Sequence, residues 1–187
     1  MSPRGLRGLD TIDRVRLAIA ALSIIVLVAV VIALGGKDWV SKPTNLNGDT
    51  LGQQSGESLP DYLVRARTSL EAASGTEFAL VTFSRPLSSQ EAGALLDDES
   101  LRRVNAAIPE ASVPVALPEP TAGKTRGEVL AQQLALAHAE DLLGGVVVYS
   151  DADSLRALAS HEGVLAVEPL PEDAAWGRIG VRPVELG

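Results

Sequence analysis

The chain has 187 residues, enough for one domain of ordinary size and a smaller segment. Its 16 basic and 24 acidic residues give a net charge of −8, which disfavours nucleic acid as a partner of the chain as a whole. It has no cysteine, which excludes disulfides, cysteine-ligated metals and thiol nucleophiles. With 3% aromatic residues, it offers little for stacking on bases or sugars.

An apolar segment near the N-terminus predicts a transmembrane helix. Leu17–Leu34 contains 18 residues, none charged and only Ser23 polar. At helical rise this run spans roughly 27 Å, close to the hydrocarbon thickness of a bilayer. The Ser23 hydroxyl can donate to a carbonyl one turn earlier, so it is tolerated there. The lipid bilayer is therefore the first expected partner.

Basic residues predict the orientation of this segment. Four arginines lie in residues 1–16, whereas the chain from Lys37 onward holds 12 basic and 22 acidic residues. The N-terminal tail is therefore expected in the cytoplasm and the rest outside, as an uncleaved signal anchor of the cytoplasmic membrane. The alternative is a cleaved signal peptide, with Ala33 and Gly35 before the cleavage point.

Composition divides the remainder into three parts. Residues 35–57 are rich in Gly, Ser, Asn, Gln, Pro and Thr, which is typical of a flexible linker. Residues 58–170 alternate helix and strand patterns and predict an extracytoplasmic α+β domain. Residues 171–187 are expected to form a C-terminal tail or an edge strand.

The first half of the domain shows clear start and stop signals. A helix is expected from Leu59, capped by Ser58, to Gly75, and Glu77–Ser84 predicts a buried central strand closed by Arg85 and Pro86. A capping box of Ser88 and Glu91 opens a helix that ends near Leu96. Leu101–Ile108 is expected to be an edge strand because it contains Arg102 and Arg103. A short edge strand is expected at Val113–Leu117 in the proline-rich loop that follows.

The second half contains the longest expected helix. A capping box of Thr125 and Glu128 opens it, and the glycine pair after Leu143 is expected to stop it. Gly145–Ser150 predicts a strand, and Asp151 or Asp153 then caps a helix that buries Leu155, Leu158 and Ala159. Gly163 is the expected C′ residue of this helix. A strand is expected at Val164–Val167, and a further edge strand at Gly180–Val184.

The order of these elements is similar to two split βαβ halves, a small ferredoxin-like α/β sandwich. Residues 154–169, SLRALASHEGVLAVEP, resemble the closing helix and strand of subtilisin-type propeptide inhibitor domains, which have that fold. The resemblance covers Phe78–Leu170 loosely and implies a protease-inhibitor role. It departs from that family because residues 111–143 carry a whole helix where a hairpin is usual, and because residues 171–187 are expected to form only a tail or an edge strand.

No motif for chemistry is complete. Gly123, Lys124 and Thr125 end like a phosphate loop, but Pro118 stands where that loop needs its first glycine. His138, Glu140 and Asp141 share one helix, and His161 lies near a helix end, so both histidines are better explained as surface or capping residues.

The acidic pairs and the serines lead to the same expectation. Asp151 and Asp153 lack the further oxygen ligands of a calcium loop, and Asp97, Asp98 and Glu99 are typical of a solvated helix end. The sequence has no Gly-x-Ser-x-Gly motif. We therefore expect no catalytic, cofactor-binding or metal-binding residues.

Three functions remain open. The first is a non-enzymatic interaction domain of the bacterial envelope, whose partner is another envelope or membrane protein. The second is a membrane-tethered protease inhibitor that uses the domain or its tail, and the third is a small envelope hydrolase that uses His138 or His161. The 13 arginines against 3 lysines, with abundant alanine, resemble proteins of GC-rich actinobacteria.

Overall fold

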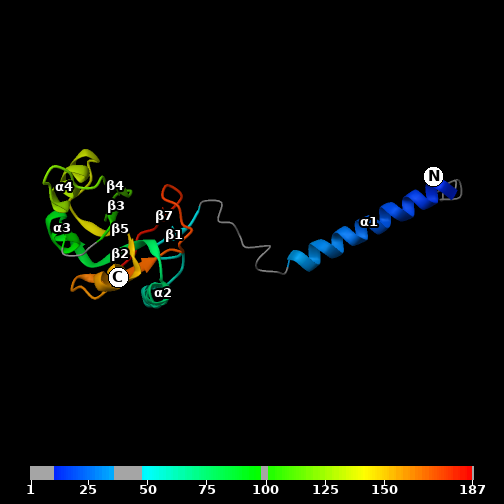
Figure 1. Ribbon diagram of the computed structural model, residues 1–187, viewed down its shortest axis with the longest axis horizontal. Coiled ribbons are helices and arrows are strands. Elements are labelled where there is room, and N and C mark those ends of the chain that lie inside the picture. Colours follow the sequence, from blue (N-terminus) through cyan, green and yellow to red (C-terminus); the bar gives the residue numbers. More distant parts are fainter. Residues whose placement is uncertain (1–10, 36–47, 98–100, 187) are drawn as a thin grey trace. The chain divides into compact units, whose positions relative to one another are not determined.

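The computed structural model describes residues 11–35, 48–97 and 101–186 (Figure 1). The chain divides into two compact units, Met1–Leu46 and Asn47–Gly187. The first unit contains α1, and the second, called the C-terminal domain below, contains the other helices and the strands. The α+β class expected from the sequence is confirmed for this domain.

Helix α1 covers Thr11–Gly35 and includes the expected membrane segment Leu17–Leu34. The Ser23 hydroxyl donates to the carbonyl oxygen of Ile19 at 2.9 Å, as the sequence predicts. The side chains at 11–14, 18 and 30–35 lie outside the described residues. Among the helix residues that are described, no stretch combines the length and hydropathy needed to cross a bilayer.

The domain is built on a five-stranded antiparallel sheet in the order β4-β3-β5-β2-β6. Its strands are β2 (Thr76–Leu87), β3 (Arg103–Pro109), β4 (Val115–Ala116), β5 (Leu143–Asp151) and β6 (Val164–Pro169). The expectation that β2 is an interior strand is confirmed, but β2 continues through Arg85 and Pro86. The edge is β4 rather than β3, because the short strand expected in the proline-rich loop pairs with Ala106 and Ala107.

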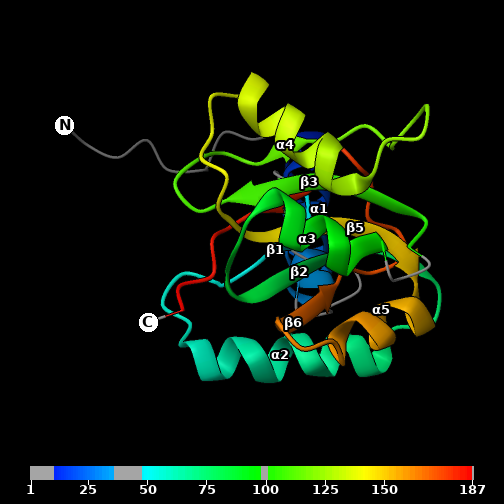
Figure 2. The ribbon, with the colours of Figure 1, turned by 90° about the vertical axis from the view of Figure 1, so that its left-hand side faces the viewer.

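Four helices surround this sheet: α2 (Leu59–Ala72), α3 (Ser89–Asp97), α4 (Arg126–Leu136) and α5 (Ala152–Ala159). In Figure 2, α3, α4 and α5 lie over one face and α2 runs beside β6. Apolar side chains of that face and of the three helices form the larger core cluster. Helices α3 and α4 cross closely where Gly93 meets Gly127, because a Cβ at Gly93 would lie 2.3 Å from the Gly127 backbone.

The expected N-caps are present. Ser58 accepts from the Asp61 amide at 3.3 Å, and Asp151 accepts from the Ser154 amide at 3.0 Å. Both predicted capping boxes close, through Ser88 with Glu91 and Thr125 with Glu128. These bonds satisfy helix donors that have no partner within the helix.

Helix α4 ends at Leu136, so its expected continuation to Leu143 is wrong. The chain turns at His138, which has a φ of +54°. The Ala139 amide donates to Leu134 and the His138 amide to Ala135, which is the Schellman arrangement of a helix end. The glycine pair that was expected to stop the helix lies inside β5 instead. Gly163 likewise is not the C′ residue of α5, which ends at Ala159, but lies with positive φ in the turn before β6.

Replacing His138 with glycine is expected to stabilise the domain by about 1 kcal/mol. A left-handed φ is costly for a residue with a Cβ and free of that cost for glycine. Urea unfolding of the two proteins measures the difference. His161→Gly is the control, because no positive φ occurs at His161 and no gain is expected there.

The second face of the sheet is covered by the two ends of the domain. β1 (Thr50–Leu51) pairs in parallel with β7 (Gly180–Val181), and Leu51 is fully buried. Side chains of the C-terminal tail pack with Leu51 against apolar residues of this face, including Leu80, Ala106 and Val147. The expected linker 35–57 is therefore too long, because its last ten residues belong to the domain, and its residues 36–47 lie outside the described residues. The predicted strand at Gly180–Val184 is shorter and joins β1 rather than the main sheet.

A buried charge network fixes residues 52–57 to the domain. Glu168 on β6 is 2% exposed; it accepts from the Gly52 amide at 2.7 Å and pairs with Arg65 of α2. Arg65 also pairs with Glu57 at 2.8 Å and donates to the Gly52 carbonyl oxygen at 3.0 Å. Burial raises the pKa of Glu168, while the hydrogen bonds from Arg65 lower the pKa of Glu57 to about 2.

Candidate interaction surface

The residues considered above as candidates for a catalytic or binding site lie apart from one another, and several of them serve the starts of helices. Lys124 donates to Gln132 at 2.7 Å, and Thr125 caps α4, so these residues begin a helix. Asp141 accepts from the amide and hydroxyl of Ser89 at the start of α3, at 2.7 and 3.2 Å. His138 is at the end of α4, and His161 follows α5.

The acidic candidates are also separated. Asp151 caps α5, and Asp153 pairs with Arg156 at 3.1 Å on the surface. Asp97 lies 4.0 Å from Arg126, whereas Asp98 and Glu99 lie outside the described residues. In the described part of the chain, no group of three His, Asp or Glu side chains is placed to hold a metal ion.

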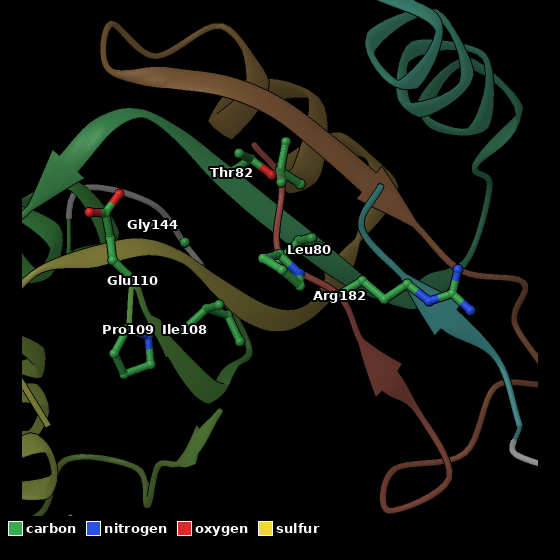
Figure 3. A pocket seen from close by; sticks show the side chains of 10 residues that line it. Leu80, Thr82, Ile108, Pro109, Glu110, Gly144 and Arg182 are labelled. Carbon is green, nitrogen blue, oxygen red and sulfur yellow. The ribbon is translucent and has the colours of Figure 1, made fainter. Parts of the chain in front are cut away.

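A groove runs between the end of β3 with the loop that follows it and residues 181–184 of the C-terminal tail. Its walls are Ile108–Pro114 and Val181–Val184, and we call it the Arg182 groove. A cavity of about 70 Å³ lies at its floor, lined by Leu80, Thr82, Gly144 and Gly145 (Figure 3). The open part along Val113 and Pro114 measures about 530 Å³.

Two glycines keep the floor of the groove hollow. Gly144 and Gly145 on β5 place no side chain there, although the neighbouring strands supply Leu80 and Ile108. A Cβ at Gly145 would lie 2.3 Å from the Val81 carbonyl oxygen, so β2 and β5 can pair here only with glycine. The hydroxyls of Thr82 and Tyr62 lie 3.1 Å apart and are hydrogen-bonded, so Thr82 already has a partner.

The rim of the groove is charged and partly apolar. Glu110 and Arg182 are exposed on opposite walls, and neither forms an ion pair with a described residue. In Figure 3 the Arg182 side chain extends away from Glu110. Val113 on the loop is 78% exposed, the largest fraction for a big apolar side chain among the described residues.

The sequence did not point to this groove. Its walls lie some seventy residues apart, and none of the motifs considered for chemistry falls in it, although the strands predicted at Val113–Leu117 and Gly180–Val184 overlap its walls. The prolines at 109, 114 and 183 were the available signal, since they prevent the ladder pairing that would close a sheet edge.

No protein-family model matches this chain, and neither a curated protein nor a solved structure is found to be similar to it.

Proposed function

We propose that the protein is a single-pass membrane protein whose exported domain binds another protein of the bacterial envelope through the Arg182 groove. Leu17–Leu34 lies in the cytoplasmic membrane, the N-terminal tail is inside, and the α+β domain is outside. The observation that carries the binding role is the groove itself: a largely apolar hollow beside the exposed Val113 and beside Arg182, which forms no ion pair with a described residue. Hollows with apolar floors and a few polar groups on the rim are typical of binding sites.

Two features support the membrane anchor. The run Leu17–Leu34 has no charged residue, and arginines precede it. The described large apolar side chains of α1, from Val15 to Val28, are each 51–64% exposed. A surface of this kind is stable in lipid and unfavourable in water.

The strand order supports a ferredoxin-like assignment for the domain. Two split βαβ units, β2-α3-β3 and β5-α5-β6, place their strands in the order β6-β2-β5-β3. The connection between the units carries β4 and α4. An inhibitor that works through its tail needs an extended tail beside an open sheet face, whereas the described tail packs over that face, so we favour the interaction role.

The membrane arrangement is tested with the full chain in bacterial cells. A periplasmic-type reporter fused after residue 187 is expected to be active, and the protein is expected to stay with vesicles washed in carbonate. A reporter that is active only in the cytosol, or release by carbonate, contradicts the anchor.

The binding role is tested by photo-crosslinking in intact cells. A photoreactive residue at position 113 is expected to give a discrete higher-mass adduct that is lost when Arg182 is replaced by Glu. The matched control is position 136 on α4, which is 67% exposed but lies outside the groove. Equal adducts at 113 and 136, or no adduct at 113, contradict the proposal.

A further inference from the structure

Among the described residues, strand β7 pairs along one edge only, with β1. The Gly180 amide donates to Asp49 at 2.8 Å, and the Arg182 amide donates to Leu51 at 2.9 Å. In a parallel ladder, the residue between two such donors directs its own N–H and C=O to the opposite edge. The backbone groups of Val181 therefore point away from β1.

The opposite edge of β7 faces the Arg182 groove. Val181, Arg182 and Pro183 form one wall, and Ile108–Pro114 form the other. Pro109 and Pro114 on that second wall have no N–H to offer. A backbone donor and acceptor of Val181 thus border an open groove of about 530 Å³ rather than a neighbouring strand of the domain.

The floor of the groove calls for an apolar side chain. Leu80, Ile108 and Val184 line the cavity, and the hydroxyl of Thr82 is already bonded to Tyr62. Its volume of about 70 Å³ exceeds the roughly 10–15 Å³ that one water needs. A small aliphatic group in the cavity would contact the Leu80, Ile108 and Val184 side chains.

From these observations we infer the form of the partner: an extended protein segment that adds as a strand to the free edge of β7 and inserts one apolar side chain into the cavity beneath. Main-chain bonds to Val181 give affinity, and the cavity selects the side chain, as in other cases of strand addition. This inference rests on the proposed function, because it specifies what occupies the same groove.

The test uses the full chain in detergent and a defined probe. The probe is a hexapeptide of alternating threonine and valine, blocked at both ends. At millimolar concentration it is expected to slow hydrogen exchange of the Val181 amide at least tenfold. The same peptide N-methylated at alternate residues is expected to have no effect, because it has lost the donors on one edge. This comparison leaves the protein unchanged.

A pair of variants tests the same bond from the protein side. Val181→Pro removes the amide that faces the groove and is expected to weaken hexapeptide binding about tenfold. Val181→Ala keeps that amide while removing side-chain packing on the tail, and is expected to change binding less than threefold. Slow exchange of the Arg182 amide, which donates to Leu51, shows that β1 and β7 stay paired in both variants.

Failure of this inference is separable from failure of the proposed function. The strand inference is overturned if the hexapeptide leaves Val181 exchange unchanged, if the N-methylated peptide binds equally well, or if both variants bind alike. A crosslinked adduct at position 113 together with any of these results retains the groove as a binding site and removes only the strand geometry.

Discussion

Gly93→Ala is expected to lower the free energy of unfolding of the domain by about 3 kcal/mol. The new Cβ would lie 2.3 Å from both the Cα and the amide nitrogen of Gly127. Both are backbone atoms, so the clash is relieved only by separating α3 from α4. The gain in helix propensity from alanine, about 1 kcal/mol, offsets only part of this cost. Urea unfolding followed by circular dichroism measures the change.

Gly127→Ala provides the matched control on the opposite helix. Its Cβ would meet the Gln90 side chain at 3.2 Å and the Ser89 carbonyl oxygen at 3.3 Å, a tighter-than-usual but far milder contact. We expect less than half of the loss caused by Gly93→Ala. Equal losses for the two variants would contradict the close crossing of α3 and α4.

Arg65→Leu is expected to cost about 3–5 kcal/mol at neutral pH, because it removes the cation that pairs with the buried carboxylate of Glu168. The pKa of Glu168, already raised by burial, rises further in this variant. A carboxyl group whose pKa is raised in the folded state destabilises the fold when it is ionised, and this cost disappears as the group takes up a proton. The deficit of Arg65→Leu is therefore largest at neutral pH and shrinks as the pH falls.

The native protein has the opposite dependence at Glu57. Its pKa of about 2 lies below the usual 4.5, so its contribution to stability is present above pH 4.5 and is lost as the pH falls toward 2.

The unfolding free energies of the native protein and Arg65→Leu, measured at several pH values, should converge in acid. Arg67→Leu, an exposed arginine of the same helix, is the control and should change little. A difference in unfolding free energy between Arg65→Leu and the native protein that stays constant down to pH 3 would contradict the buried ion pair of Arg65 and Glu168.

Local chemistry explains which elements could be predicted. The caps at Ser58 and Thr125 depend on residues within one turn, so the sequence carries the whole signal, and for α5 it leaves only the choice between Asp151 and Asp153. The end of α4 had no such signal, because His138 occupies a conformation that usually identifies itself by glycine. The glycines that looked like a helix stop serve β5 instead, where one of them allows close approach to Val81.

Long-range contacts explain what could not be predicted. Thr50 and Leu51 lie in a polar, glycine-rich stretch, and only their pairing with Gly180 and Val181 makes them a strand. The Arg182 groove needs the same tail folded back toward Ile108, so no short pattern encodes it. The length of the linker was therefore overestimated, and the domain begins ten residues before the expected position.

The parallel pairing of β1 with β7 determines when the domain can complete its fold during synthesis. Thr50 leaves the ribosome long before its partner Gly180, which is 130 residues later. Until then Leu51 has no strand to join, and the apolar second face of the sheet stays uncovered. The domain can thus complete its fold only after nearly the whole chain has been translated.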